Sequence, residues 1–150
     1  MIDNAPTRAK ALFESGYYCA ESVLLAASES LEVSCDAIPR IATGLCSGVA
    51  RTGGLCGALL GGILAIGLGL GRDRSDESVE PVYDAVASLL KSFSDRYGAT
   101  SCGDLTGCDL GTDEGQVRFR ETSQHERCEE YVAMATELAL QEIAVRRPTA

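Results

Sequence analysis

The sequence has no tryptophan, only one histidine and no two cysteines spaced as Cys-x-x-Cys. The missing spacing excludes a thioredoxin-type redox pair, a zinc ribbon and the Cys-x-x-Cys-His sequence that attaches c-type haem. Residues 1–8 contain no apolar run that would serve as a signal peptide. We therefore expect a location in the reducing cytoplasm, where cysteines more often bind metals or undergo redox chemistry than form structural disulfides.

Positive charge is also scarce. The chain has 13 Lys and Arg residues against 22 Asp and Glu residues, which gives a net charge of −9. A surface of this sign repels polyanions over most of its area. We therefore expect no nucleic acid partner and no binding to anionic membrane surfaces.

Apolar residues, by contrast, are abundant enough to form a core. The 150 residues are 45% hydrophobic and 23% charged, a composition unlike that of a disordered chain. A chain of this length usually buries one core. We therefore expect a single domain over residues 1–150.

Apolar residues recur every three or four positions along most of the chain, as they do on one face of an α-helix. This spacing predicts helices over residues 4–30, from about Asp36 to Val49, over residues 79–97 with Gly98 as the closing glycine, and over residues 123–145. Residues 100–107 are expected to form one short helical turn, and residues 108–122 a surface connection. No strand-like alternation competes. The predicted fold is all-α, a bundle of about five helices.

One further helix is expected within residues 52–71, a run of twenty residues that has no charge and eight glycines. Such a run is long enough to cross a bilayer. Against that, glycine alternates with leucine at its end, which would fray a helix and shorten the apolar span. We favour a buried, glycine-rich central helix over a membrane-spanning one, because helices that are apolar on all sides also occur in protein cores.

The seven cysteines are the most informative residues. Cys19 and Cys128 lie on the apolar stripes of predicted helices, whereas Cys56 and Cys102 lie near predicted helix starts. Before Cys102, the spacing from Ser101 to Asp104 resembles a capping box. A helix N-terminus favours thiolate and lowers the pKa of a cysteine, so these two positions suit a nucleophile or a metal ligand. The alternative for each is an ordinary buried cysteine, which behaves as a small hydrophobic residue.

The other three cysteines and the histidine have less certain roles. Cys46 lies on a predicted apolar stripe and is expected to be structural. Cys35 and Cys108 lie in predicted connections, where each is an exposed thiol, a resolving partner or a substitute ligand. His125 is expected on the polar side of its helix as a solvated residue rather than a ligand.

Four blocks of the sequence each contain one of the cysteines Cys19, Cys56, Cys102 and Cys128. They are Phe13-x-x-Gly16-x-x-Cys19-Ala20-Glu21-x-Val23-Leu24, then Cys56-Gly57-Ala58-Leu59-Leu60-Gly61, then Phe93-x-x-x-Tyr97-Gly98-x-x-x-Cys102-x-x-Leu105-x-Gly107, and finally Cys128 with Tyr131-Val132. In this order the blocks resemble the C_GCAxxG_C_C family of redox-active proteins. The resemblance extends from Phe13 to about Leu138.

The resemblance implies a helical domain in which Cys19, Cys56, Cys102 and Cys128 serve a shared redox or cluster-binding purpose. The family is also similar to the helical scaffold of split-Soret cytochromes, which carry haem and an iron–sulfur centre. Because this chain lacks a haem attachment sequence, an iron–sulfur cluster held by the four cysteines is the expected cofactor, with tetrahedral zinc as the alternative.

Two other functions stay open. In a metal-free redox protein, Cys56 or Cys102 would attack a substrate and another cysteine would resolve the product as a disulfide. Alternatively, the chain is a non-catalytic accessory of a transporter, since members of the family are often encoded near transporter genes. A homodimer through the small-residue face fits each of these functions. The sequence identifies neither the redox partner nor an arrangement that would establish an enzyme.

Overall fold

The structure of the chain is a computed structural model that describes residues 4–147. Within this range the regular elements are all helical, as predicted: α1 (Ala5–Ser15), α2 (Cys19–Ser30), the 3-10 helix η2 (Arg40–Leu45), α3 (Cys46–Arg51), α4 (Gly57–Leu70), α5 (Glu80–Tyr97), α6 (Cys102–Thr106), α7 (Asp113–Glu121) and α8 (Gln124–Arg146). The described range thus contains eight α-helices rather than the expected five or so, because several are short.

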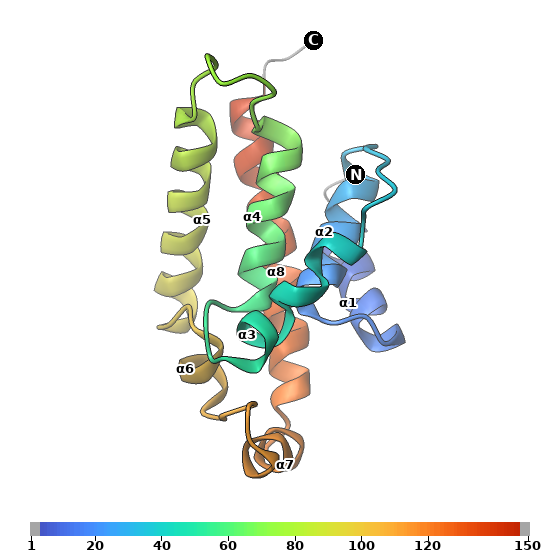
Figure 1. The fold of residues 1–150 in the computed structure, drawn as a ribbon, viewed down its shortest axis with the longest axis vertical. Coiled ribbons are helices and arrows are strands. Elements are labelled where there is room, and N and C mark those ends of the chain that lie inside the picture. Colours follow the sequence, from blue (N-terminus) through green and yellow to red (C-terminus); the bar gives the residue numbers. More distant parts are fainter. Residues whose placement is uncertain (1–3, 148–150) are drawn as a thin grey trace.

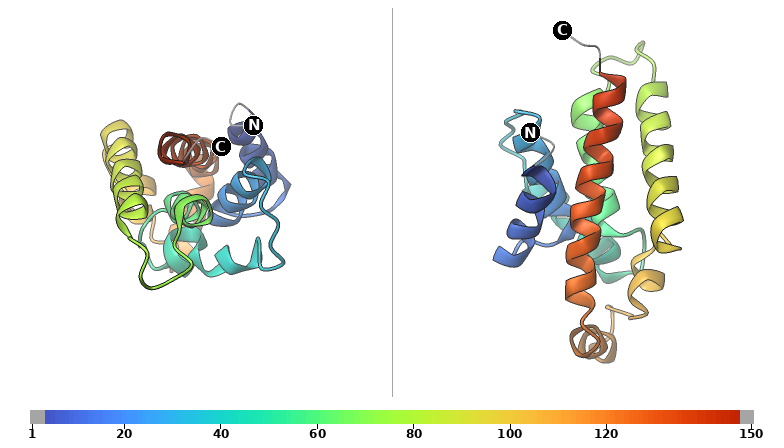
Figure 2. Two further views of the ribbon diagram at one scale, coloured as in Figure 1. Left: turned by 90° about the horizontal axis from the view of Figure 1, so that it is seen from above. Right: turned by 180° about the vertical axis from the view of Figure 1, so that it is seen from behind.

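Helices α4, α5 and α8 run side by side along the long axis of the molecule, and the pair α1 and α2 packs on the other side of α4 and α8 (Figures 1 and 2). Helix α4 contacts α2, α5 and α8. Its glycines allow these close approaches. A Cβ atom on Gly61 would lie 2.7 Å from the Ala20 carbonyl oxygen, and one on Gly69 would lie 2.7 Å from Cγ2 of Ile143. The uncharged glycine-rich run therefore packs closely against neighbouring helices.

The membrane alternative was raised by the same run. Helix α4 has 14 residues. Among the helices of residues 4–147, none combines the length and the apolarity needed to span a bilayer.

The predicted helix over residues 4–30 is broken in the structure. Gly16 adopts a left-handed conformation with φ of 119° and closes α1, which no other residue type would do as readily. Helix α2 then begins at Cys19, where the Glu21 carboxylate accepts a hydrogen bond from the Tyr18 N–H at 3.0 Å. Cys19 is therefore the first residue of a helix rather than a residue in the middle of one.

The helix predicted from Asp36 to Val49 does not form as such. The 3-10 helix η2 begins at Arg40, and Asp36 does not cap it. Residues 47–51 all have positive φ, so the segment called α3 is a left-handed turn. Such a turn interrupts the right-handed helix, and Ile41 and Val49, two apolar residues of the predicted helix, are exposed.

The second half of the chain follows the predictions more closely. Helices α5 and α8 match the predicted ranges within a residue or so, and Gly98 closes α5 with φ of 80°. Helix α6 is the predicted short turn. Residues 108–122 were expected to be a surface connection, which is wrong: they contain α7, whose first turn is capped by Thr112 accepting the Gly115 N–H at 3.0 Å.

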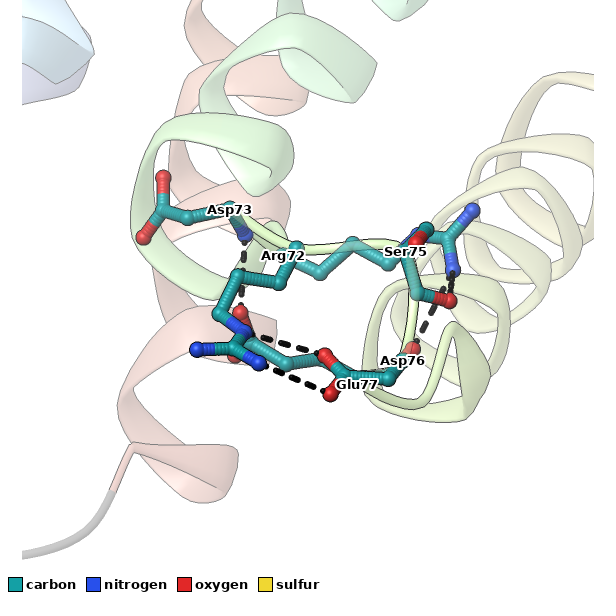
Figure 3. A network of polar contacts seen from close by, with 6 residues as sticks. Arg72, Asp73, Ser75, Asp76 and Glu77 are labelled. Carbon is teal, nitrogen blue, oxygen red and sulfur yellow. Dashed lines mark hydrogen bonds and ion pairs between the residues drawn. The ribbon is translucent and has the colours of Figure 1, made fainter.

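The connection from α4 to α5 is held by polar groups of its own, at the opposite end of the bundle from α3, α6 and α7 (Figures 1 and 3). The Arg72 guanidinium donates to the carbonyl oxygens of Ser75 and Glu77 at 2.8 and 3.2 Å. Arg74 forms an ion pair with Asp76 at 3.0 Å, and this contact lowers the pKa of the Asp76 carboxyl. These contacts close the turn that brings α5 back alongside α4.

Candidate functional site

A cavity of about 180 Å³ lies at the end of the bundle that carries α3, α6 and α7. Cys19, Cys56, Cys102 and Cys128 all line it. They come from α2, from the residue before α4, from α6 and from α8. The structure therefore brings together the four cysteines that the sequence singled out, although they are separated by up to 109 positions in the chain.

Three of the four cysteines lie at helix starts. Cys19 and Cys102 are the first residues of α2 and α6, and Cys56 is the N-cap of α4. The start of α6 is fixed by the Ser101 hydroxyl, which accepts the Asp104 N–H at 3.1 Å, as the predicted capping spacing requires. Helix starts are close to one another here, so residues far apart in the chain share one cavity.

Cys56 and Cys102 are joined through the backbone. The Cys56 N–H donates to the Thr100 carbonyl oxygen at 2.8 Å, and the Cys102 N–H donates to the Gly54 carbonyl oxygen at 2.7 Å. These bonds flank an isolated antiparallel bridge between Leu55 and Ser101. The bridge holds the start of α4 against the start of α6, a pairing that local sequence patterns do not reveal.

Two of these cysteine side chains lie against glycines, where any larger residue would overlap them. A Cβ atom on Gly57 would overlap Sγ of Cys19, and a Cβ atom on Gly48 would overlap Cβ of Cys102. Gly48 also has φ of 65°, a conformation that favours glycine. Both positions therefore require glycine for the cavity to keep its present form.

The left-handed turn over residues 47–51 forms part of the cavity wall, since Ser47 and Arg51 line it. Each residue other than glycine in this conformation costs about 1–2 kcal/mol. The Ser47 N–H donates to Sγ of Cys19 at 3.5 Å. The turn therefore presents a backbone donor to one of the four sulfur atoms.

Three of the four cavity thiols have raised pKa values, which favour the protonated form. Burial raises the pKa of Cys56 to about 11 and that of Cys128 to about 12, and it also raises the pKa of Cys102. Backbone N–H groups of Leu59 and Ala58 favour the Cys56 thiolate, but their effect on its pKa is smaller than that of burial. The lowered pKa predicted for Cys56 and Cys102 from their places at helix starts is therefore wrong for the metal-free chain.

Cationic and aromatic groups also surround the cavity. Arg51, Arg120 and His125 line it, although the protein as a whole is acidic. His125 is exposed and stacks on Phe13, with ring centroids 4.6 Å apart. Sequence reasoning expected a solvated histidine and did not find this stacking, because Phe13 lies more than a hundred positions away in α1.

The remaining cysteines differ from one another. Cys35 is exposed, whereas Cys46 and Cys108 are buried. An exposed thiol at Cys108 was one of the expectations, and the structure contradicts it: its S–H donates to the Thr106 carbonyl oxygen at 3.3 Å. A side-chain hydrogen bond with Cys19, and then burial, raises the pKa of Cys46 above its ordinary range. Cys46 therefore lies directly behind one of the cavity thiols.

The cavity thiols do not meet at one point. Across residues 4–147, no three side chains of His, Cys, Asp or Glu converge as ligands of one metal ion. The four thiols thus surround a space without meeting at one point. Tetrahedral zinc, by comparison, has four ligands about 2.0–2.3 Å from a single ion.

One comparison with known proteins identifies a family. The family model described as "Putative redox-active protein (C_GCAxxG_C_C)" matches residues 17–142. A protein of Archaeoglobus fulgidus, printed as "Uncharacterized protein", is 30% identical over 148 residues, covering 92% of each chain. No solved structure gives a significant match. Because the match covers most of the chain and includes all four cysteines of the cavity, the chain belongs to the C_GCAxxG_C_C family.

Proposed function

We propose that this protein is a one-electron carrier or redox sensor whose four cavity cysteines hold an iron–sulfur cluster. The observation that carries the proposal is that Cys19, Cys56, Cys102 and Cys128 line one cavity although they come from four separate helical segments. Four cysteine thiolates are the usual ligand set of such clusters. A purely structural role would not require the four thiols to share a cavity.

The size of the cavity supports a group larger than a single ion. An engineered apolar cavity of about 150 Å³ accepts benzene, and this cavity is about 180 Å³. Since no three ligand side chains of the described residues meet at one point, the thiols suit a group with several metal atoms better than a mononuclear site. We therefore favour a cluster over zinc. When bound, a cluster supplies reversible one-electron transfer.

The chain itself would contribute thiolate ligands, a hydrogen bond to one of them and an apolar lining. Thiols with raised pKa values must lose their protons to become ligands, so loading of the site should release protons and weaken as pH falls. The Ser47 N–H would continue to donate to Sγ of Cys19, which is a known way to adjust a reduction potential. Apolar residues such as Ala58 and Leu105 line the cavity and limit access of water.

The metal-free alternative assigned attack to the thiolate of Cys56 or Cys102. The raised pKa values of both groups oppose that role, because only the thiolate is nucleophilic. The two residues also lie diagonally across the bridge between Leu55 and Ser101. Diagonal neighbours in an antiparallel pair are about 7–8 Å apart, which is too far for a disulfide without backbone movement.

The experiment is purification or reconstitution without oxygen, followed by measurement of iron, acid-labile sulfide and the visible absorption spectrum. Iron and sulfide in comparable amounts and a coloured protein are expected. Each of the substitutions C19S, C56S, C102S and C128S should lower the iron content severalfold. A protein that stays colourless and free of iron after anaerobic reconstitution would overturn the proposal.

Cys35→Ser is the matched control, because Cys35 is exposed and lies outside the cavity. It should retain the full iron content. Loss of iron in this variant equal to that of the four cavity variants would also contradict the proposed ligand set. Circular dichroism on all variants separates loss of the site from loss of the fold.

A further inference from the structure

Cys46 and Cys19 are neighbours, although only Cys19 lines the cavity. Sγ of Cys19 lies 3.5 Å from the backbone nitrogen of Ser47, the residue directly after Cys46. The space that a Cβ atom on Gly57 would fill is bordered by Sγ of Cys19 and, at 3.3 Å, by Cα of Cys46. The Cys19 sulfur therefore lies against the backbone that carries the second thiol.

The surroundings of the two thiols differ in a way that assigns them different roles. Cys19 is half-buried, faces the cavity and accepts the Ser47 N–H. Cys46 is only 4% exposed and packs among Ala20, Leu24 and Ala42. A small reagent in the cavity can reach the first sulfur but not the second.

We propose that Cys19 and Cys46 form a dithiol–disulfide couple that exchanges with a low-molecular-weight disulfide entering the cavity, with Cys19 as the attacking thiol and Cys46 as the resolving thiol. This couple extends beyond the four cavity cysteines, since Cys19 is one of them and Cys46 is not. Its existence does not depend on the proposed cluster.

The chemistry needs two exchange steps. The Cys19 sulfur attacks one sulfur of the disulfide RSSR, so that a Cys19–SR bond forms, the RS–SR bond breaks and the first RS⁻ leaves with the Cys19 proton as RSH. In the mixed disulfide, Cys19 has lost the thiol whose hydrogen bond contributes most to the raised pKa of Cys46. The Cys46 sulfur then attacks Sγ of Cys19, and the second RS⁻ leaves with the Cys46 proton. Two protein thiols are oxidised to one disulfide, and one RSSR is reduced to two RSH.

The couple has a consequence for the cavity, and this consequence alone rests on the proposed function. A bond to Cys46 would take the Cys19 sulfur away from the other three cavity thiols. Oxidation by a small disulfide would then prevent the four-thiol site from loading. Reduction of the bond would restore it.

The test uses oxidised glutathione as the probe and tryptic mapping as the readout. Trypsin cleaves after Lys10, Arg40 and Arg51, so Cys19 and Cys35 share the peptide 11–40, and Cys46 is alone in the peptide 41–51. In the Cys35→Ser chain, a disulfide joining these two peptides is necessarily Cys19–Cys46. The full-length Cys35→Ser protein is incubated with defined ratios of oxidised to reduced glutathione, quenched with acid, alkylated and digested.

The expected result is that the linked peptide becomes the main form of both segments at oxidising ratios and disappears on reduction. In Cys35→Ser/Cys46→Ser, Cys19 should instead accumulate as the mixed disulfide with glutathione. Cys35→Ser/Cys46→Ala provides a second variant should the serine disturb packing. The matched control is Cys35→Ser/Cys108→Ser, because Cys108 is also buried and lies outside the cavity lining; it should form the linked peptide as before.

Failure to form the linked peptide in folded Cys35→Ser protein, with Cys19 carrying glutathione or remaining free, would overturn the inference. A disulfide from Cys19 to Cys56, Cys102 or Cys128 would overturn it as well. Neither outcome bears on iron binding. Conversely, a chain that forms the linked peptide but never binds iron would refute the proposed cluster and leave the couple intact.

Discussion

The Sγ atom of Cys19 occupies the place where a side chain on Gly57 would begin. Gly57 is the first residue of α4 and Cys19 is the first residue of α2, so the two helix starts meet at this contact. The Cα atom of Cys46 borders the same point at 3.3 Å. The missing side chain of Gly57 thus allows the Cys19 thiol to lie between the start of α4 and the buried Cys46.

Replacement of Gly57 by alanine should destabilise the protein. The added methyl group would overlap Sγ of Cys19 and lie 3.1 Å from the Leu45 carbonyl oxygen, where the backbone cannot move freely. Overpacking of this kind costs about 1–3 kcal/mol in the free energy of unfolding. Urea denaturation followed by circular dichroism measures the change.

Gly67→Ala is the control for this prediction, since it lies in the same helix with no heavy atom within 4 Å of its Cβ position. Alanine there should raise the free energy of unfolding by about 0.5–1 kcal/mol, because glycine is a poor residue inside a helix. Equal effects of the two substitutions would show that Gly57 does not act through the contact with Cys19.

The metal-free protein should show slow alkylation of Cys56 and Cys128. Their pKa values, raised by burial to about 11 and 12, leave very little thiolate at pH 8. Labelling by iodoacetamide, mapped by mass spectrometry, should rise about tenfold per pH unit between pH 8 and 10 at both residues. The exposed Cys35 provides the internal reference. Labelling of Cys56 at the rate of Cys35 at pH 8 would contradict the raised pKa.

Stability should decline in alkaline solution. A thiol whose pKa is raised in the folded state stabilises the fold fully below the pKa of the unfolded chain, and that contribution is lost as pH rises through the folded value. For Cys56 this window runs from 9.0 to about 11, and the contribution is about 2–3 kcal/mol at about 1.4 kcal/mol per unit. Urea midpoints of metal-free protein between pH 8 and 11 should show the loss.

Cys56→Ala should make that pH dependence flatter, because the titrating group is gone. Cys35→Ser should retain the wild-type slope, as Cys35 is exposed. An identical decline in wild-type protein and Cys56→Ala would mean that other groups cause it.

Removal of the cap at the start of α6 should weaken the cavity locally. The Ser101 hydroxyl accepts the Asp104 N–H at 3.1 Å, one residue before Cys102. Ser101→Ala should lower the free energy of unfolding by about 0.5–2 kcal/mol, and Ser101→Thr should restore most of it. Faster alkylation of Cys102 in Ser101→Ala would show that the cap positions the thiol.

Ser123 offers a matched comparison, since it stands at the N-cap of α8 and forms no capping hydrogen bond through its side chain. Ser123→Ala should therefore change the free energy of unfolding by less than about 0.5 kcal/mol. If Ser101→Ala and Ser123→Ala lower the free energy of unfolding by the same amount, loss of the cap at Ser101 is not the cause of the change.

The predictable parts of this protein were those encoded by neighbouring residues. The stripe of residues 79–97, the closing glycine at Gly98 and the capping spacing from Ser101 to Asp104 are local, and the structure confirms them. The left-handed turn over residues 47–51 was not predicted, because it contains valine and alanine, which rarely adopt a left-handed backbone conformation. Helical spacing also does not say whether another segment covers a given residue, and Tyr83 of α5 is exposed.

The spacing of apolar residues determined the all-helical class, and the motifs around the cysteines determined the candidate set and the absence of close thiol motifs, because these properties reside in the chain. Only the tertiary structure decided that the four thiols share one cavity, that burial raises the pKa of Cys56, Cys102 and Cys128, and that Cys46 lies behind Cys19. Distances between sulfur atoms depend on how helices pack, and desolvation depends on what covers each thiol. The sulfur distances and the desolvation are therefore set only when segments far apart in the sequence pack together in the folded protein.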